Sequence, residues 1–434
     1  MRQNKKLKKY IIFILLFIFF ILNLSGLFNL TVYADNYNVH SPLPDSFNNQ
    51  NNQNYLNIEE TTVDLLNGIY DAVGGNDVKK NMPDSAKEYL TDYENGENSE
   101  NFENSENADG NLKIEDISSK FSLGFIFNMA MRAAGSLTSA AVRNFIPVVA
   151  FILLSAVVEI VKNLHEPESS SGFSEILNFV MIICLAGAVF YSVRGCFFTA
   201  KKFLEDIHMY MMTMIPVMAS LSTLSGNFAA AAVNSSGLYA VLNVVDGISA
   251  DVILPVLQIC YALSLAQNIT ESSGTINLSG ISSYIRSALN WIFIFIMTVL
   301  VTILFFQNIL ASSADTVAAR AIKFSVTSFV PVVGGVIGDA SRTIMGSIQA
   351  VKSITGIFGV LVIIATLLPP LITVVLHKLM LKISGAVALI LGMDRQSNFF
   401  KEMNSLLDIT LAIMISVAVV FIFDITIFIK TVSV

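Results

Sequence analysis

Seven windows without a charged residue run through the chain, and they constrain its fold more than any other feature. A bilayer crossing requires about 20 mostly apolar residues. One window is 39 residues long, so we expect it to hold two short crossings hinged at Gly226–Asn227. The pattern predicts an all-α, polytopic helical membrane protein with six to eight crossings. The windows are Asn144–Val158 (extended past Glu159), Ile176–Val193, Ile207–Val245, Val252–Thr270, Ser287–Ala314, Ser353–Leu376 and Ile409–Phe423 (extended to Ile429).

The composition agrees with a membrane location. Apolar residues make up 54% of the chain and charged residues only 14%, with a mean hydropathy of +0.64. A typical soluble domain has about a quarter of its residues charged. The three cysteines, Cys184, Cys196 and Cys260, lie in or beside apolar segments, so no disulfide framework is available to the N-terminal part.

The N-terminus has the pattern of a secretory signal peptide. A basic start is followed by the apolar run Tyr10–Leu22, and Val32-Tyr33-Ala34 places small residues at the two positions that a signal peptidase reads. We therefore predict that residues 1–34 are removed by cleavage between Ala34 and Asp35. The alternative is an uncleaved anchor, because the apolar character continues through 23–30.

The next segment, 35–120, differs sharply in charge from the rest of the chain. Its net charge is −13, whereas that of 121–434 is +1. The stretches 46–54 and 94–109 are too polar to bury enough apolar surface to fold. We predict a largely disordered, exported tether with one short amphipathic helix at 58–73. The membrane domain is expected to span 121–434.

The orientation of the crossings is not settled by loop charges. Short loops rich in Lys and Arg are expected on the cytoplasmic side. The segment 162–175 is mainly acidic, whereas 194–206 holds Arg194, Lys201 and Lys202. If the N-terminal segment is exported and 144–161 crosses the membrane fully, the basic segment 194–206 would lie on the extracytoplasmic side. That is opposite to the side expected from its charge. We also interpret 123–141 as a helix that lies in the membrane interface before the first crossing.

One stretch, Ser325–Ser347, is apolar enough for a membrane but too broken for a plain crossing. It contains one proline and four glycines, and the acidic Asp339 directly follows the third glycine. The proline and glycines are Pro331, Gly334, Gly335, Gly338 and Gly346. Proline removes a helical hydrogen bond, and each glycine costs about 1 kcal/mol relative to alanine. Membranes tolerate irregular backbone only where protein or a cavity surrounds it. We interpret Pro331, Gly334, Gly335, Gly338 and Asp339 as a structural hinge or pore element. The alternative is a proline-kinked helix packed through its glycines.

A pattern of an aliphatic residue followed by Pro-Val occurs four times, around Pro147, Pro216, Pro255 and Pro331. The separations form two similar pairs, which suggests parallel repeats over 142–249 and 250–376, an arrangement known in transporters. The alternative is coincidence among kinked helices.

An ionisable residue inside the membrane is energetically costly, so each one is a candidate for a functional role. Most of the candidates lie near window edges, where interface solvation explains them; Asp339 and Asp424 are the exceptions. Polar groups for a transported substrate could come from Asn234-Ser235-Ser236, which are uncharged, and in the second half from Ser341-Arg342-Thr343, which includes a basic residue. The full set of acidic candidates is Glu159, Asp246, Asp251, Asp315, Asp339 and Asp424.

Enzymatic functions find little support. Gly335-Val336-Ile337-Gly338-Asp339 does not have the glycine spacing of an intramembrane aspartyl protease. The chain has no phosphate-binding Gly-Lys-Ser/Thr loop, and its four histidines are too scattered for a zinc site. We expect a protein that is not an enzyme, with no catalytic residues, cofactor or metal.

The run from Lys323-Phe324-Ser325 through Phe329-Val330-Pro331-Val332-Val333-Gly334-Gly335 to Asp339-Ala340 and Gly346-Ser347 resembles the stage III sporulation protein AE family. The layout of a signal peptide, a variable exported segment and a hydrophobic body is similar too. The resemblance covers about the last 310 residues and brings no catalytic residues with it.

The resemblance implies a component of the channel or secretion complex that connects mother cell and forespore during endospore formation. It would lie in the mother-cell membrane around the forespore, with an extracytoplasmic N-terminal segment. Its expected partners are the other stage III sporulation channel proteins and membrane lipid, without nucleic acid, and a homo-oligomer is one assembly to consider. The alternative function is a self-contained secondary transporter with a broken-helix substrate site.

Overall fold

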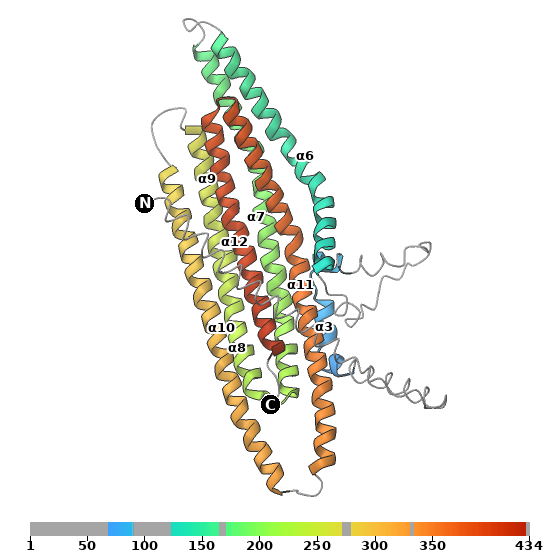
Figure 1. Ribbon diagram of the computed structural model, residues 1–434. Coiled ribbons are helices and arrows are strands. Elements are labelled where there is room, and N and C mark those ends of the chain that lie inside the picture. The colour runs from blue at the N-terminus through green and yellow to red at the C-terminus, as the bar shows by residue number, and fades with distance from the viewer. Residues whose placement is uncertain are drawn as a thin grey trace, which may run out of the picture.

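In the computed structural model, the chain forms an elongated helical bundle (Figure 1). The structure describes residues 68–88, 90, 123–164, 171–270, 279–329 and 334–430. Within these ranges, only the backbone is described at 158–164, 171–175, 268–270, 310–329 and 334–345, and at a few single positions. All regular structure in the described residues is helical. The signal peptide and cleavage site, residues 1–34 with Asp35, lie outside them.

Long helices run up and down the bundle in alternating directions (Figure 1). In the view of that figure, α6 (Leu123–Leu164) rises, α7 (Ser171–Leu224) descends, and α8 (Phe228–Ile248) rises again. The π-helical turn η1 (Ser249–Ile253) joins α8 to α9 (Leu254–Thr270) without a break. α10 (Ser279–Phe329) descends, α11 (Gly334–Ile390) rises, and α12 (Asp394–Lys430) returns to the lower end.

Six of these helical stretches are long and apolar enough to cross a membrane, in agreement with the lower end of the expected six to eight. They share a high mean hydropathy, and their bounds are Ile126–Val157, Phe179–Leu224, Phe228–Gln267, Gly280–Gln307, Gly346–Ile390 and Asp394–Ile429. The predicted hinge at Gly226–Asn227 is confirmed. α7 ends at Leu224 and α8 begins at Phe228, and Gly226 has a φ of +81°, a left-handed conformation that favours glycine.

The predicted loop at 194–206 is wrong, because these residues lie inside α7. Lysine, leucine and glutamate are good helix formers, and Lys201 pairs with Glu205 one turn later, at 3.6 Å. The windows 176–193 and 207–224 are therefore parts of one helix of 54 residues, about 80 Å long. These basic residues are therefore not in a loop, and the rule for loop charges does not apply to them. In the same way, the expected interfacial helix 123–141 and the first window form one helix, α6.

α11 and α12 form the most extensive contact of the bundle. Small residues allow their close approach. Gly356 and Gly359 on α11 face Ile429 and Ile425 of α12, and Gly359 also faces Met214 of α7. A similar contact brings Gln307 of α10 against Gly237 of α8. α12 is consequently the most buried of the six candidate spans, whereas α10 exposes a long apolar face that includes Trp291, Phe295 and Phe306.

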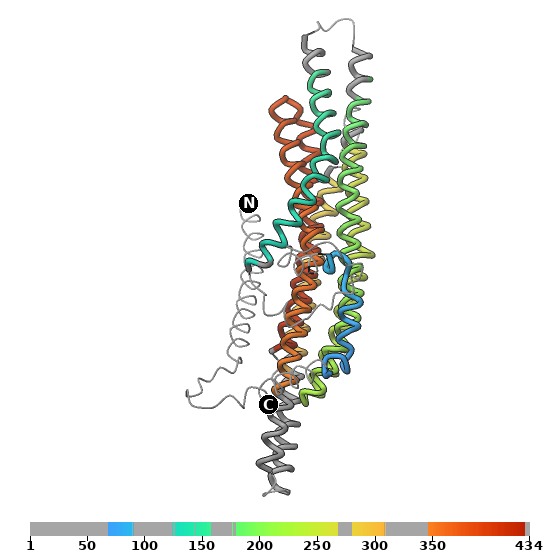
Figure 2. Tube along the Cα trace, turned by 90° about the vertical axis from the view of Figure 1, so that its right-hand side faces the viewer, coloured from blue at the N-terminus to red at the C-terminus, as the bar shows by residue number. Residues whose placement is uncertain are grey.

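Part of the acidic N-terminal segment is folded against the bundle. Residues 68–90 form short helices, among them α3 (Gly75–Lys80), and Figure 2 shows this blue segment alongside α7. Tyr70 is buried, its hydroxyl donates to the carbonyl oxygen of Gly75 at 2.7 Å, and burial raises the pKa of its phenol. The side chains of Asp77, Asp84 and Glu88 remain exposed. The stretches 46–54 and 94–109, expected to be disordered, lie outside the described residues.

Candidate functional site

The residues of the expected hinge lie where α10 gives way to α11. α10 ends at Phe329, and Gly334, Gly335, Gly338 and Asp339 belong to the first turns of α11. Pro331 lies outside the described residues, and the side chain of Asp339 is likewise not described. The chain reverses its direction here (Figure 1). The role of these residues in a hinge or pore stays a prediction.

The expected repeats meet inside a continuous helix. The boundary between 142–249 and 250–376 falls within η1, while Pro147 and Pro216 lie inside α6 and α7. Pro255 is in the first turn of α9. The repeat remains a prediction.

The acidic candidates have different surroundings. Asp246 on α8 lies 3.5 Å from Nδ1 of His208 on α7, and both side chains are partly exposed. Asp251 is exposed on η1. The side chains of Glu159 and Asp315 are outside the description, as are those of Ser341-Arg342-Thr343. Asp424 is the one acidic side chain of the described residues that is buried.

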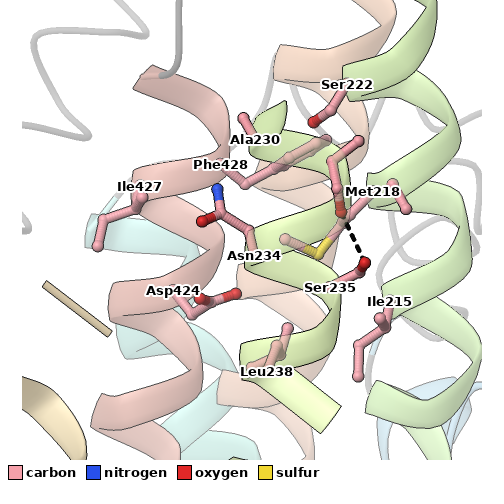
Figure 3. Close-up of a pocket in the computed structure, with 12 residues that line it drawn as sticks. Ile215, Met218, Ser222, Ala230, Asn234, Ser235, Leu238, Asp424, Ile427 and Phe428 are labelled. Atoms are coloured by element: carbon pink, nitrogen blue, oxygen red, sulfur yellow. Dashed lines mark hydrogen bonds between the residues drawn. The ribbon is translucent and has the colours of Figure 1, made fainter. Parts of the chain in front are cut away.

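Asp424, six residues before the end of α12, lines a pocket between α7, α8 and α12 (Figure 3). α8 contributes Asn234 and Ser235, and α7 contributes Ser222. Figure 3 shows Asp424 and Asn234 reaching toward the space between their two helices. The structure thus brings together Asp424 and two of the three polar positions that the sequence suggested, across about 190 residues of chain. The apolar walls are formed by Ile215, Met218, Leu238, Ile427 and Phe428.

The pocket is small, and its polar groups are mainly oxygen atoms. Its cavity volume is about 20 Å³, which is room for one water molecule or one small ion. The Ser235 hydroxyl donates to the carbonyl oxygen of Ala231 at 2.6 Å, as the dashed line in Figure 3 marks. Its hydrogen is therefore engaged, and its lone pairs remain able to accept. The cavity is too small for an organic substrate.

A buried lysine lies on another side of the same region. Lys352 of α11 is fully buried, and its Nζ lies 4.9 Å from the ring centroid of Phe428, one turn after Asp424 on α12. This position fits a cation–π contact. Sequence reasoning missed Lys352 because it directly precedes an apolar window, where a lysine is usually solvated at the membrane interface.

Three further contacts of charged side chains lie at different heights of the bundle: His208 with Asp246, Lys378 with Asp408, and Arg286 with Glu402. Lys378 of α11 forms an ion pair with Asp408 of α12. Arg286 of α10 is buried, and its Nη1 donates to the carbonyl oxygen of Glu402 at 3.1 Å.

These polar contacts do not combine the His, Cys and carboxylate ligands of a transition-metal centre. Among the residues with described side chains, no group of three His, Cys, Asp or Glu side chains is placed to hold a metal ion. Cys184, Cys196 and Cys260 are free thiols. The pocket is thus defined by one carboxylate and neutral oxygen groups.

Comparison with known proteins gives a specific result. The family described as stage III sporulation protein AE matches residues 113–432. The chain is also 21% identical over 240 residues to the stage III sporulation protein AE of Bacillus subtilis (strain 168). That alignment covers 55% of this chain and 59% of the relative, so it spans less than two thirds of the relative's length. No solved structure matches the chain.

Proposed function

The chain belongs to the stage III sporulation protein AE family, and from that premise we propose that it is an integral membrane component of the complex connecting mother cell and forespore. In this proposal it is a non-enzymatic part of a channel or secretion apparatus that sporulation requires. The observation that carries the proposal is the extent of the family match, which includes all six candidate spans.

The proposed location is the mother-cell membrane around the forespore. The proposed partners are the other stage III sporulation channel proteins. The N-terminal segment would be extracytoplasmic. The charges of Asp77, Asp84 and Glu88 on the folded segment 68–90 are exposed, so this segment is expected outside the hydrocarbon core.

Within that complex, we assign the hinge or pore role to Pro331, Gly334, Gly335, Gly338 and Asp339. The break between α10 and α11 within this stretch supports the assignment. Small residues also let neighbouring helices approach closely in membranes. A bulky side chain here should therefore interfere with assembly or conduction more than with insertion.

Affinity purification from sporulating cells tests the membership of the complex. The full chain carries a tag, and an unrelated multi-pass membrane protein with the same tag, produced at the same level, is the control. We expect the other stage III sporulation proteins to copurify with this chain and not with the control. Recovery of the chain alone, at normal abundance and from gentle detergent, would contradict the proposal.

A variant pair tests the hinge. Gly334→Leu or Gly335→Leu should abolish late forespore gene expression while protein abundance stays near normal. The matched control is Gly187→Leu on α7, an exposed helical glycine with open space around its Cα. If the Gly334 and Gly335 variants behave like the control, the segment is an ordinary helix end and has no special role.

A self-contained secondary transporter is the second candidate function, and one observation favours it. The pocket at Asp424 and Asn234 places polar groups in the interior of an apolar layer, as coupling-ion sites of transporters do. Transport by the purified chain alone in liposomes would favour this candidate. Dependence on copurifying proteins would favour the channel complex.

A further inference from the structure

The folded segment 68–90 has one buried apolar face and one charged face. From Val78 onward every fourth residue is buried, and these side chains join the hydrophobic core of the bundle: Val78, Met82, Ala86 and Leu90. The other face carries exposed charged residues, which are Asp71, Asp77, Lys80, Asp84 and Glu88. The segment is therefore held on the bundle by its apolar side and presents its charges to the surroundings.

The apolar face of the segment lies along the last third of α7. A Cβ atom at Gly74 would lie 3.7 Å from Cγ2 of Val217, and Asp84 is close enough to Asp206 to interact with its charge. The segment therefore runs antiparallel to α7 over 11 residues, about 16 Å. The stretch 207–224 of α7 contains no Asp, Glu, Lys or Arg, and it belongs to the second candidate span.

The exposed apolar face of α10 lies at the same height of the bundle. Residues before and after Val217 line the pocket together with Leu238 of α8, and Gly237, next to Leu238, contacts Gln307 of α10. Val217 and Gln307 therefore lie at a similar height. The segment extends about 16 Å upward from there, which corresponds to residues 296–307 of α10, because α7 and α10 both descend.

These two surfaces lie on opposite sides of the bundle. Figure 1 shows α10 at the left edge and the blue segment at the right. α10 packs on α8, α8 packs on α7, and α7 carries the segment. At this one height, α10 exposes Val299, Ile303 and Phe306, whereas the opposite side exposes charged residues.

The α10 side has the properties of a surface in contact with lipid. Its sequence has no charged residue from Ser287 to Ala314, which is long enough to cross a bilayer. Tyr284 and Trp291, near the upper end of this stretch, are 76% and 69% exposed, and such aromatic residues are enriched at membrane interfaces. α10 also includes the least buried of the six candidate spans. Lipid acyl chains are therefore the expected surroundings of residues 296–307.

The charged side requires water at the same depth. Exposed ionised side chains are strongly unfavourable in hydrocarbon, and at membrane depth they face a protein interior or a water-filled cavity. A bundle with lipid on one side and water on the other is part of a wall that separates the two.

We propose that segment 68–90 lines a water-filled passage at the depth of the bilayer, with α10 on the lipid side of the same wall. One bundle supplies only part of such a wall, and further protein subunits complete it. The inference therefore rests on the proposed channel complex, and it adds which surface of this chain meets the passage. Because the segment belongs to the exported part of the chain, the passage opens toward the extracytoplasmic side.

Cysteine labelling in membranes from sporulating cells tests both surfaces. The membranes are opened by sonication in the presence of a charged maleimide, so that the reagent reaches both membrane surfaces. Asp77→Cys and Lys80→Cys should react as fully as they do after denaturation. Val299→Cys and Ile303→Cys should react at least about tenfold less, because lipid excludes the charged reagent. The unmodified chain, with its native cysteines, supplies the background.

Ala86→Cys is the matched control, because Ala86 lies on the buried face of the same segment. It should be protected as long as the segment is docked on α7. A hydrophobic reagent that forms a carbene on illumination, dissolved in the same membranes, should label α10 between residues 291 and 309 and leave segment 68–90 unlabelled.

Three results would overturn the proposal. Full reaction of Val299→Cys and Ile303→Cys would place both sides of this level in water. Protection of Asp77→Cys and Lys80→Cys would show that no water reaches the segment, and reaction of Ala86→Cys would show that the segment is not docked. If neither reagent reached α10, its assignment to lipid would be wrong. Copurification of the other subunits is measured separately, so failure of the passage and failure of the complex are distinguishable.

Discussion

Gly356 of α11 lies directly against Ile429 of α12, so closely that a methyl group in place of its hydrogen would overlap Cγ1 of the isoleucine. Ile429 also presents its carbonyl oxygen to the Gln349 side chain of α11, at 3.4 Å. The lower end of this helix pair therefore depends on the absence of a side chain at one position.

Gly356→Ala should consequently destabilise the protein by about 1–3 kcal/mol, because the added methyl group overpacks a tight contact. Gly346→Ala is the matched control on the same helix, since Gly346 is exposed with open space around it. There the gain in helix propensity should leave stability unchanged or slightly higher. Thermal unfolding in detergent measures both variants, and equal effects would contradict the described packing.

Arg286→Met should lower the free energy of unfolding by about 1–3 kcal/mol, because the guanidinium loses its charge-assisted hydrogen bond to the Glu402 carbonyl. The methionine keeps most of the aliphatic volume. Arg194→Met on α7 serves as the control, since Arg194 is exposed. An Arg286 variant as stable as the Arg194 variant would show that the α10–α12 contact is unimportant.

The ion pair of Lys378 with Asp408 should contribute less. The Asp408 side chain is 56% exposed, and solvent screening limits such pairs to about 0.2–1 kcal/mol. Lys378→Glu should destabilise slightly by placing two acids together, and the double variant Lys378→Glu/Asp408→Lys should recover the loss. A double-mutant cycle on melting temperatures measures the coupling. If the swap gives no recovery, the two side chains do not interact in solution.

The exported form should begin at Asp35. Mass spectrometry of the protein purified from membranes should find this N-terminus, and Ala34→Arg should block processing because the peptidase requires a small residue there. His40→Arg, beyond the cleavage site, is the control and should be processed normally. Intact peptides covering residues 1–34 in the unmodified protein would identify an uncleaved anchor instead.

The apolar windows located the helices well because burial in lipid requires long uncharged stretches, and local turn chemistry located the Gly226–Asn227 hinge. The continuity of α7 could not be predicted in this way. The charges at 194–206 indicated a loop, although the same residues form a helix in which Lys201 pairs with Glu205 and Arg194 and Lys202 are exposed.

The residues of the pocket could be predicted from the sequence, but their proximity could not. Asp424 is an acid in an apolar segment, and Asn234-Ser235 are polar residues in another apolar segment. Their proximity depends on how α8 and α12 pack, which no local pattern encodes. Lys352 and Arg286 escaped notice because a basic residue at the edge of an apolar window has the same pattern whether it is solvated or buried.

The π-helical turn η1 has a consequence for the register of α9. A π-turn accommodates one residue more than an α-helical turn, and each residue of an α-helix rotates the side-chain direction by about 100°. Without a π-turn, one extra residue would rotate α9 by that angle. Deletion of Ala250 should therefore convert η1 into an ordinary α-helical turn, with Leu257 and Cys260 still buried and Ile259 still exposed. The π-turn thus absorbs one amino acid without changing which side of α9 faces the protein.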